Sequence, residues 1–81
     1  MRVTVKLFAL LREIAERGET VLEVPEEISC GEVLSRLQDE IPSLFLVLER
    51  CFIAVNGRYA DKNEHVSEED EIAILPPVSG G

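Results

Sequence analysis

The sequence predicts an α+β fold in which one mixed sheet of four or five strands packs on a single main helix. Three observations predict it. Residues 2–8 alternate between apolar and polar side chains, residues 33–41 carry an apolar stripe at helical spacing, and residues 71–75 form a short apolar run that ends at two prolines. The 81 residues allow one domain, which we place at residues 1–75, followed by an extended, flexible C-terminal Gly-Gly tail at residues 76–81.

The first part of the chain is predicted to form a strand, a short helix and a second strand. Residues 2–8 alternate with period two, whereas residues 9–17 change to helical spacing, and Gly18 is suited to end that helix as a left-handed C-cap. The inward positions are Val3, Val5 and Leu7 in the strand and Leu11, Ile14 and Ala15 in the helix. Residues 20–24 predict a second strand that Pro25 stops. The sequence leaves open whether the two strands pair directly.

The main helix has the clearest start signal in the chain. Ser29 and Glu32 have the spacing of a capping box, in which each side chain binds the backbone amide of the other residue. The helix runs to about Glu40 and stops before Pro42. Its apolar stripe consists of Val33, Leu34, Leu37 and Ile41. Residues 44–48 are apolar throughout and too short to classify.

The last part of the chain is predicted to be mostly strand. Residues 51–55 form one strand, Asn56-Gly57 is the strongest two-residue turn signal, and residues 58–60 form a short return strand. Residues 67–70 form a polar turn before the final strand at residues 71–75. This order of strands and helices favours a β-grasp, or ubiquitin-like, roll.

Composition excludes several classes of partner. Eight Lys and Arg oppose sixteen Asp and Glu, which gives a formal net charge of -8, and a surface of this sign does not favour nucleic acid. No run approaches the ~20 apolar residues of a membrane span, and the first residues do not form a signal peptide, so we expect a cytoplasmic protein with no membrane partner. An acidic chain suits a protein partner whose own pocket is basic because it handles phosphates.

Patterns for catalysis and metal binding are nearly absent. The one histidine, His65, lies in a polar stretch, and Cys30 and Cys51 are expected to be free thiols in a reducing compartment. The four acids at residues 68–71 are more typical of a solvated turn than of a cation site. We therefore expect no metal and no bound cofactor. Whether the chain is itself an enzyme stays open.

The C-terminal tail is the most informative feature. Pro76 and Pro77 stop the strand ladder and favour a stiff, extended exit from the domain. Gly80 and Gly81 have no side chains, so a narrow channel could admit them and a reagent could approach the final carboxylate from any side. These residues predict chemistry at the carboxylate of Gly81.

A second feature points to a protein partner. If alternate residues of the strands face the helix, Phe8, Phe52 and Leu75 face the other way, and Tyr59 lies on the short return strand. These four side chains would form an apolar patch on the open face of the sheet, and such patches mark interfaces. The alternative is that loops or residues 44–48 cover them.

Three stretches of the chain resemble the small subunit of molybdopterin synthase. They are Phe8-Ala9-Leu10-Leu11-Arg12-Glu13, Ala54-Val55-Asn56, and Asp70-Glu71-Ile72-Ala73 leading into Pro76-Pro77-Val78-Ser79-Gly80-Gly81. The resemblance runs from the first residue to the last, and the Pro-Pro-Val-Ser-Gly-Gly ending is its most specific element. The Gly-Gly ending alone is shared with ubiquitin and with the thiazole-synthesis sulfur carrier.

The resemblance implies a β-grasp sulfur carrier that acts in molybdenum cofactor biosynthesis. In that family the terminal glycine, here Gly81, is adenylated with ATP by an activating enzyme and then converted to a thiocarboxylate (1-thioglycine). The carrier inserts its tail, here Pro76, Pro77, Val78, Ser79 and Gly80, into a pocket of the large synthase subunit. There it donates sulfur to cyclic pyranopterin monophosphate, and two carriers supply the dithiolene of molybdopterin.

The resemblance also implies the partners. They are the large subunit in a heterotetramer, an adenylyltransferase that resembles ubiquitin-activating enzymes, and a sulfur donor. The family's interface uses the outer sheet face and the tail, which here implies Phe8, Arg12, Phe52, Tyr59 and Leu75. Two other functions remain as alternatives, a thiazole-synthesis sulfur carrier and a ubiquitin-like protein modifier that forms isopeptide bonds. A plain interaction domain with an inert tail is a third.

Overall fold

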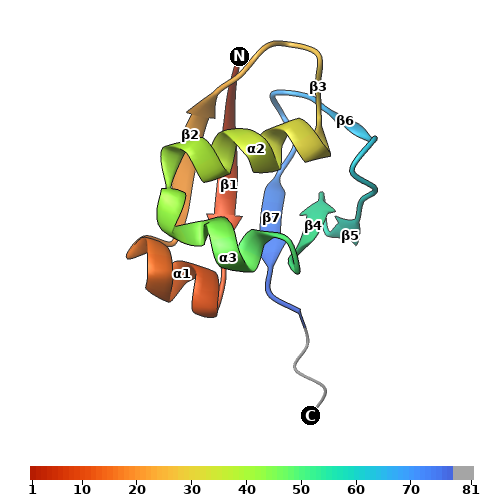
Figure 1. The fold of residues 1–81 in the computed structure, drawn as a ribbon. Coiled ribbons are helices and arrows are strands. Elements are labelled where there is room, and N and C mark those ends of the chain that lie inside the picture. The colour runs from red at the N-terminus through yellow and green to blue at the C-terminus, as the bar shows by residue number, and fades with distance from the viewer. Residues whose placement is uncertain (78–81) are drawn as a thin grey trace.

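The computed structural model describes residues 1–77, whose strands form a five-stranded mixed sheet and a separate two-stranded ladder (Figure 1). The large sheet has the order β2-β1-β7-β4-β5, and the small ladder pairs β3 with β6. The strands are β1 (Arg2–Leu7), β2 (Glu19–Glu23), β3 (Ile28–Ser29), β4 (Phe52–Val55), β5 (Arg58–Tyr59), β6 (His65–Val66) and β7 (Ile72–Leu75). The helices are α1 (Leu10–Ala15), α2 (Cys30–Glu40), the 3₁₀ turn η1 (Pro42–Leu44) and α3 (Phe45–Leu48). The predicted mixed sheet packed on one main helix is confirmed.

The sheet is mixed because two neighbouring inner strands, β1 and β7, run parallel. β1 pairs with β7 in parallel, with Leu7 opposite Ile74, and every other pair of neighbouring strands in this sheet is antiparallel. β1 and β2 pair directly, with Val3 opposite Leu22, which answers the question that the sequence left open. The parallel pair places the end of β7 beside the end of β1. The chain therefore leaves the sheet next to Phe8 and α1.

The core lies between the sheet and the helices. Alternate residues of β1 and β7 point into it, and they meet the apolar stripe of α2. Among the fully buried side chains are Val3, Val5, Leu7, Leu11, Val33, Leu37, Leu44, Ile72 and Ile74. The period-two and helical patterns of the sequence therefore pointed to the correct faces.

The start of α2 is the predicted capping box. The Ser29 hydroxyl accepts a hydrogen bond from the Glu32 amide at 3.2 Å, and the Glu32 carboxylate accepts one from the Ser29 amide at 3.1 Å. The Ser29 amide and hydroxyl both hold the pKa of Glu32 below its ordinary value. The Asn56-Gly57 turn is also confirmed, since both residues have positive φ, 53° and 84°.

One predicted cap is wrong. The left-handed residue that ends α1 is Glu16, with φ of 58°, rather than Gly18. The helix is shorter than the sequence suggested, because the Gly18 carbonyl already accepts a hydrogen bond from the Leu7 amide at 2.9 Å. Gly18 is thus the first residue to bind back to β1, and the helix must end before it.

Four short elements were not predicted. Residues 44–48 belong to η1 and α3, which pack against α2 and α1. The ladder of β3 and β6 pairs Ile28 with Val66 and Ser29 with His65, so it holds the loop before β7 against the start of α2. Within residues 1–77, no helix is long and apolar enough to cross a membrane.

Candidate functional site

The open face of the sheet carries the apolar residues that the sequence placed there. Leu75 of β7 is opposite Phe52 of β4. Leu7, the residue before Phe8, is opposite Ile74. Tyr59 of β5 is opposite Ala54 of β4. Its ring packs on that of Phe52 with a distance of 5.5 Å between the ring centroids. Phe52, Tyr59 and Leu75 therefore lie on one face of three neighbouring strands, and Phe8 directly follows β1, which pairs with β7. We call these four side chains the sheet-face patch.

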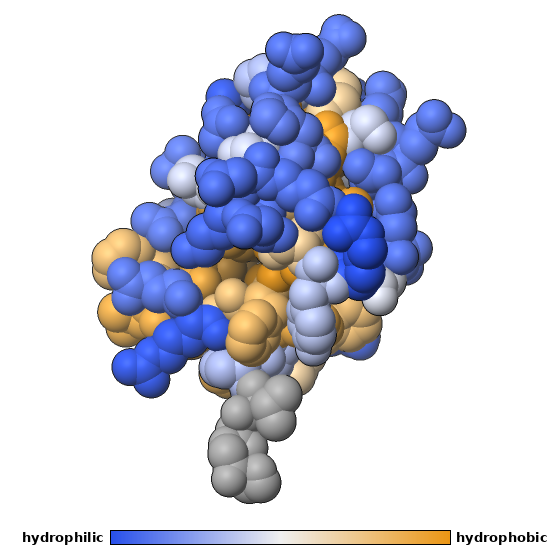
Figure 2. Space-filling model, turned by 90° about the vertical axis from the view of Figure 1, so that its right-hand side faces the viewer, coloured by the Kyte–Doolittle hydropathy of each residue, from blue (hydrophilic) through white to orange (hydrophobic). Residues whose placement is uncertain are grey.

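The sheet-face patch is open to solvent. Phe8, Phe52 and Tyr59 are 43%, 49% and 66% exposed, and Leu75 is half-buried. Residues 44–48 do not cover it, because they pack with α1 and α2 in the helical layer. Figure 2 shows apolar side chains gathered at the end of the molecule where β7 ends, whereas the opposite end is mostly hydrophilic. An uncovered apolar surface of this kind marks an interface.

Arg12 lies apart from the patch. It is exposed on α1 and lines a hollow with Ala9, Glu13, Glu16 and Arg17, over Gly18. A Cβ added to Gly18 would lie 3.6 Å from the Arg12 Nε, so the guanidinium packs along the glycine backbone. Arg12 therefore flanks the end of β1 rather than joining the aromatic cluster.

The base of the tail is well defined. Pro76 is half-buried and Pro77 is exposed, and both follow β7 directly. Val78, Ser79, Gly80 and Gly81, which the sequence singles out for tail insertion and chemistry, lie outside the described residues.

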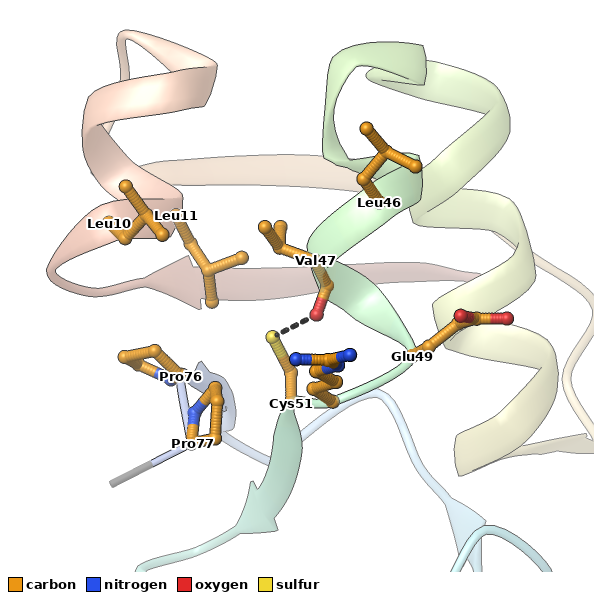
Figure 3. A pocket seen from close by; sticks show the side chains of 9 residues that line it. Leu10, Leu11, Leu46, Val47, Glu49, Cys51, Pro76 and Pro77 are labelled. Carbon is orange, nitrogen blue, oxygen red and sulfur yellow. Dashed lines mark hydrogen bonds between the residues drawn. The ribbon is translucent and has the colours of Figure 1, made fainter. Parts of the chain in front are cut away.

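A groove beside the two prolines is a feature that sequence reasoning missed. It has a volume of about 410 Å³ and lies between α1, α3 and the end of the described chain (Figure 3). We call it the tail-base groove. Its lining residues are Leu10, Leu11, Leu46, Val47, Glu49, Arg50, Cys51, Pro76 and Pro77. No local pattern predicts it, because its walls come from three separate parts of the chain.

The described residues show no constellation for catalysis. No group of three or more His, Cys, Asp and Glu side chains within residues 1–77 is placed to hold a metal ion. Burial raises the pKa of both thiols, Cys30 and Cys51, which disfavours the reactive thiolate at neutral pH. Cys30 is fully buried, and the Cys51 thiol donates to the Val47 carbonyl at 3.0 Å. The features that stand out within residues 1–77 are thus the exposed sheet-face patch and the tail-base groove.

Comparison with known proteins identifies the family. The ThiS family model matches residues 5–81. The chain belongs to the ThiS family. It is 32% identical to the molybdopterin synthase sulfur carrier subunit of Chlamydomonas reinhardtii over all of both chains. It is 36% identical to the protein of that name from Drosophila melanogaster, covering all of this chain and 92% of the relative.

Solved structures of the same fold agree with this assignment. The structure of SAMP1 from Haloferax volcanii superposes with a TM-score of 0.89 at 30% identity, covering all of both chains. A protein–protein complex of subunits 1 and 2 of the molybdopterin-converting factor from Helicobacter pylori contains a chain that superposes with a TM-score of 0.72 at 27% identity, again over all of both chains. The β-grasp, ubiquitin-like fold and the resemblance to the molybdopterin synthase small subunit are therefore both confirmed.

Proposed function

We propose that this protein is the sulfur carrier subunit of molybdopterin synthase and that Gly81 is its reacting residue. The observation that carries the proposal is the match over the whole chain to curated relatives of that name, including the residues of the tail. The ending Pro-Pro-Val-Ser-Gly-Gly supports it. The protein acts in the cytoplasm and binds no cofactor of its own.

The chemistry has three steps, all at the Gly81 carboxylate. A carboxylate oxygen attacks the α-phosphorus of ATP on an activating enzyme, and pyrophosphate leaves. Sulfide released by a donor then attacks the acyl carbon, AMP leaves, and a thiocarboxylate remains. On the synthase, the thiocarboxylate sulfur attacks a carbon of cyclic pyranopterin monophosphate and displaces the oxygen substituent from that carbon. Water then cleaves the acyl carbon–sulfur bond, which restores the carboxylate and leaves the sulfur on the pterin. Two carriers supply the two sulfurs of the dithiolene.

The shape of the chain suits a carrier that visits other proteins' active sites. Pro76 and Pro77 fix φ at the base of the tail, and the four residues that follow can reach about 13 Å in an extended conformation. Gly80 and Gly81 present only backbone, so a narrow pocket can take them. The tail insertion residues are therefore Pro76 to Gly80, and Gly81 carries the reaction.

The partners follow from the same proposal. The large synthase subunit binds the sheet-face patch and the tail in a heterotetramer, with Phe8, Arg12, Phe52, Tyr59 and Leu75 at the interface. The Helicobacter pylori complex of subunits 1 and 2 supports a pairing of this kind. An adenylyltransferase that resembles ubiquitin-activating enzymes uses ATP to activate Gly81, and a separate donor supplies the sulfur.

A reconstituted synthase reaction tests the proposal. It contains the large subunit, the activating enzyme, ATP, a sulfur donor and the pterin precursor, and it measures molybdopterin formed. Deletion of Gly81 should abolish product, because the carboxylate then falls one residue short of the reacting position. Ser35→Ala, on the exposed face of α2, is the control and should keep the activity, since it leaves the tail and its terminal carboxylate unchanged. Full activity after deletion of Gly81 would overturn the proposal.

A second candidate function is protein modification. It is favoured by the similarity to SAMP1 of Haloferax volcanii, since a second solved structure describes that protein as a small archaeal modifier protein. Modification also begins with adenylation of the terminal glycine, but the acceptor is a lysine amine. An epitope-tagged chain expressed in cells separates the two functions. Conjugates of higher mass that disappear on deletion of Gly81 would support a modifier role, and their absence would leave the carrier role alone.

The thiazole-synthesis carrier is the remaining alternative within the same mechanism. The name of the family model does not exclude it, whereas the curated relatives carry the molybdopterin synthase name. Complementation decides between them. The chain should restore molybdoenzyme activity to cells that lack their own molybdopterin synthase carrier, and it should not restore growth without thiamine to cells that lack the thiazole carrier.

A further inference from the structure

The tail-base groove is an exposed apolar surface separate from the sheet-face patch. Leu46 on α3 is 79% exposed and Leu10 on α1 is 48% exposed, and the two face the groove from opposite sides. Pro76 and Pro77 close its lower edge, as Figure 3 shows. A small domain gains nothing in stability from an apolar side chain left in water. Such exposure next to a hollow is typical of a binding surface.

The groove and the sheet-face patch flank the same point of the chain. Leu75 is the last residue of β7 and belongs to the patch, whereas Pro76 and Pro77, the next two residues, line the groove. A protein that takes residues 78–81 into a pocket must come within about 13 Å of Pro77. Such a protein therefore comes close to both surfaces.

Arg50 adds a positive charge to the lining of the groove, which bears on the kind of partner that it can bind. None of the three ion pairs within residues 1–77 includes Arg50. Glu49 points away from the prolines in Figure 3. A cation beside an apolar groove, on a chain of net charge -8, favours a partner that places a carboxylate there, because a guanidinium pairs with a carboxylate through two parallel hydrogen bonds.

We propose that the tail-base groove of this chain is a docking site for the large synthase subunit. The groove receives an apolar side chain of that subunit, next to a carboxylate of the same subunit that pairs with Arg50. This inference rests on the proposed function. It adds a second contact surface, formed by Leu10, Leu46 and Arg50, to the sheet-face patch. The tail is then held at its base from two sides, which fixes the direction in which it enters the partner's pocket.

Binding measurements with the purified large subunit test the groove. Leu46→Asp and Arg50→Glu should each weaken binding about tenfold or more, because the first places a charge in an apolar contact and the second reverses the sign of a pairing charge. Val21→Asp is the matched control. Val21 is 53% exposed on the edge strand β2, two strands away from β7, and its substitution should change the dissociation constant by less than about twofold.

The outcomes separate the inference from the proposed function. If the wild-type chain does not bind the large subunit, both fail. If it binds and the two groove variants bind as tightly as Val21→Asp, only the groove inference is overturned. Thermal unfolding of each variant by circular dichroism shows that a loss of binding is not a loss of folding, and Arg50→Lys should recover part of the affinity that Arg50→Glu loses.

Alkylation of Cys51 gives a second readout that needs no substitution. Cys51 lines the groove and is half-buried, whereas Cys30 is fully buried and serves as the internal control. The large subunit should slow maleimide labelling of Cys51 in the carboxylate form of the carrier, measured by mass spectrometry. Unchanged labelling in the complex would overturn the inference. So would faster labelling of the isolated chain after removal of residues 78–81, or a shift from dimer to monomer in Leu46→Asp, since these would show the tail or a second copy in the groove.

Discussion

Asp70 holds together the two turns that lead into the tail strand. Its carboxylate accepts hydrogen bonds from the Ser67 amide at 2.7 Å and from the Asn56 side chain at 2.9 Å. Asn56 in turn accepts a hydrogen bond from the Glu71 amide at 2.9 Å. The Ser67 amide, followed by Asn56, lowers the pKa of Asp70 below its ordinary value. One carboxylate thus fixes the Asn56-Gly57 hairpin relative to the start of β7.

Asp70→Ala should therefore make the free energy of unfolding less dependent on pH in the acid range. Since the folded pKa of Asp70 is lowered, its contribution is present at pH above the unfolded value of about 3.9 and is lost as pH falls through the folded pKa. The substitution should lower the free energy of unfolding by about 1 kcal/mol at neutral pH and by less in acid. Urea unfolding at a series of pH values measures this.

Glu68→Ala is the control for Asp70, because it removes an acid from the same turn whose side chain makes no hydrogen bond within the described residues. It should change stability by less than about 0.5 kcal/mol throughout the pH series. Equal effects of the two substitutions would show that charge alone, rather than the hydrogen bonds of Asp70, stabilises the turn.

Among the elements, α2 depends most on local sequence. The capping box of Ser29 and Glu32 satisfies the amides at its start, and Ile41 ends it by donating to the Leu37 carbonyl at 2.8 Å. Ser29→Ala should lower the free energy of unfolding by about 1 kcal/mol. Ser35→Ala, on the exposed face of the same helix, should be neutral or slightly stabilising, since alanine has the higher helix propensity. Chemical denaturation of both variants gives the comparison, and similar losses would contradict the role of the cap.

Elements with a local signal could be predicted from the sequence, and those that depend on tertiary contacts could not. The alternation around Val5 and the stripe around Leu37 identified the buried faces correctly. The ladder of β3 and β6 has two residues in each strand, too few to show a period, and it forms because the loop before β7 folds back to α2. The C-cap predicted at Gly18 is wrong, because the Gly18 carbonyl accepts a hydrogen bond from the Leu7 amide. That hydrogen bond depends on the register of β1 with β2, which the local sequence does not show.

The candidate site also has a part that the sequence predicted and a part that it could not predict. Strand alternation predicted that Phe8, Phe52 and Leu75 would share the open face. The structure places Phe52 beside Leu75 and Tyr59, and Phe8 is exposed directly after β1. The tail-base groove could not be predicted, because Leu10, Leu46 and Pro77 meet only after α1, α3 and β7 have packed. Resemblance placed Arg12 at the interface, and the structure places it on α1 over Gly18, apart from the patch.

At the scale of the whole molecule, one face separates apolar from charged surface. On the face that Figure 2 shows, the apolar residues gather at the end where β7 ends, and the other end is mostly hydrophilic. With a net charge of -8, the chain should be drawn toward a partner whose pocket is basic because it binds phosphates. This arrangement suits a carrier that must find its partners quickly and then place a short tail accurately.

The charge leads to a kinetic prediction. The association rate with the activating enzyme and with the large subunit should fall as ionic strength rises, because salt screens the attraction between the acidic chain and a basic pocket. The dissociation rate should change less, since most of the contacts that we propose at the base of the tail are apolar. Stopped-flow or surface plasmon resonance over a range of salt concentrations measures both rates. An association rate independent of salt would contradict electrostatic steering.

The central claim is that Gly81 carries sulfur, and mass spectrometry of the intact chain tests it most directly. The protein is incubated with the activating enzyme, ATP and a sulfur donor, and its C-terminal peptide is then compared with that of the untreated chain. The account predicts that one oxygen of the Gly81 carboxylate is replaced by sulfur and that omission of ATP prevents the change. A C-terminal peptide of unchanged mass, under conditions that load an established sulfur carrier, would contradict it.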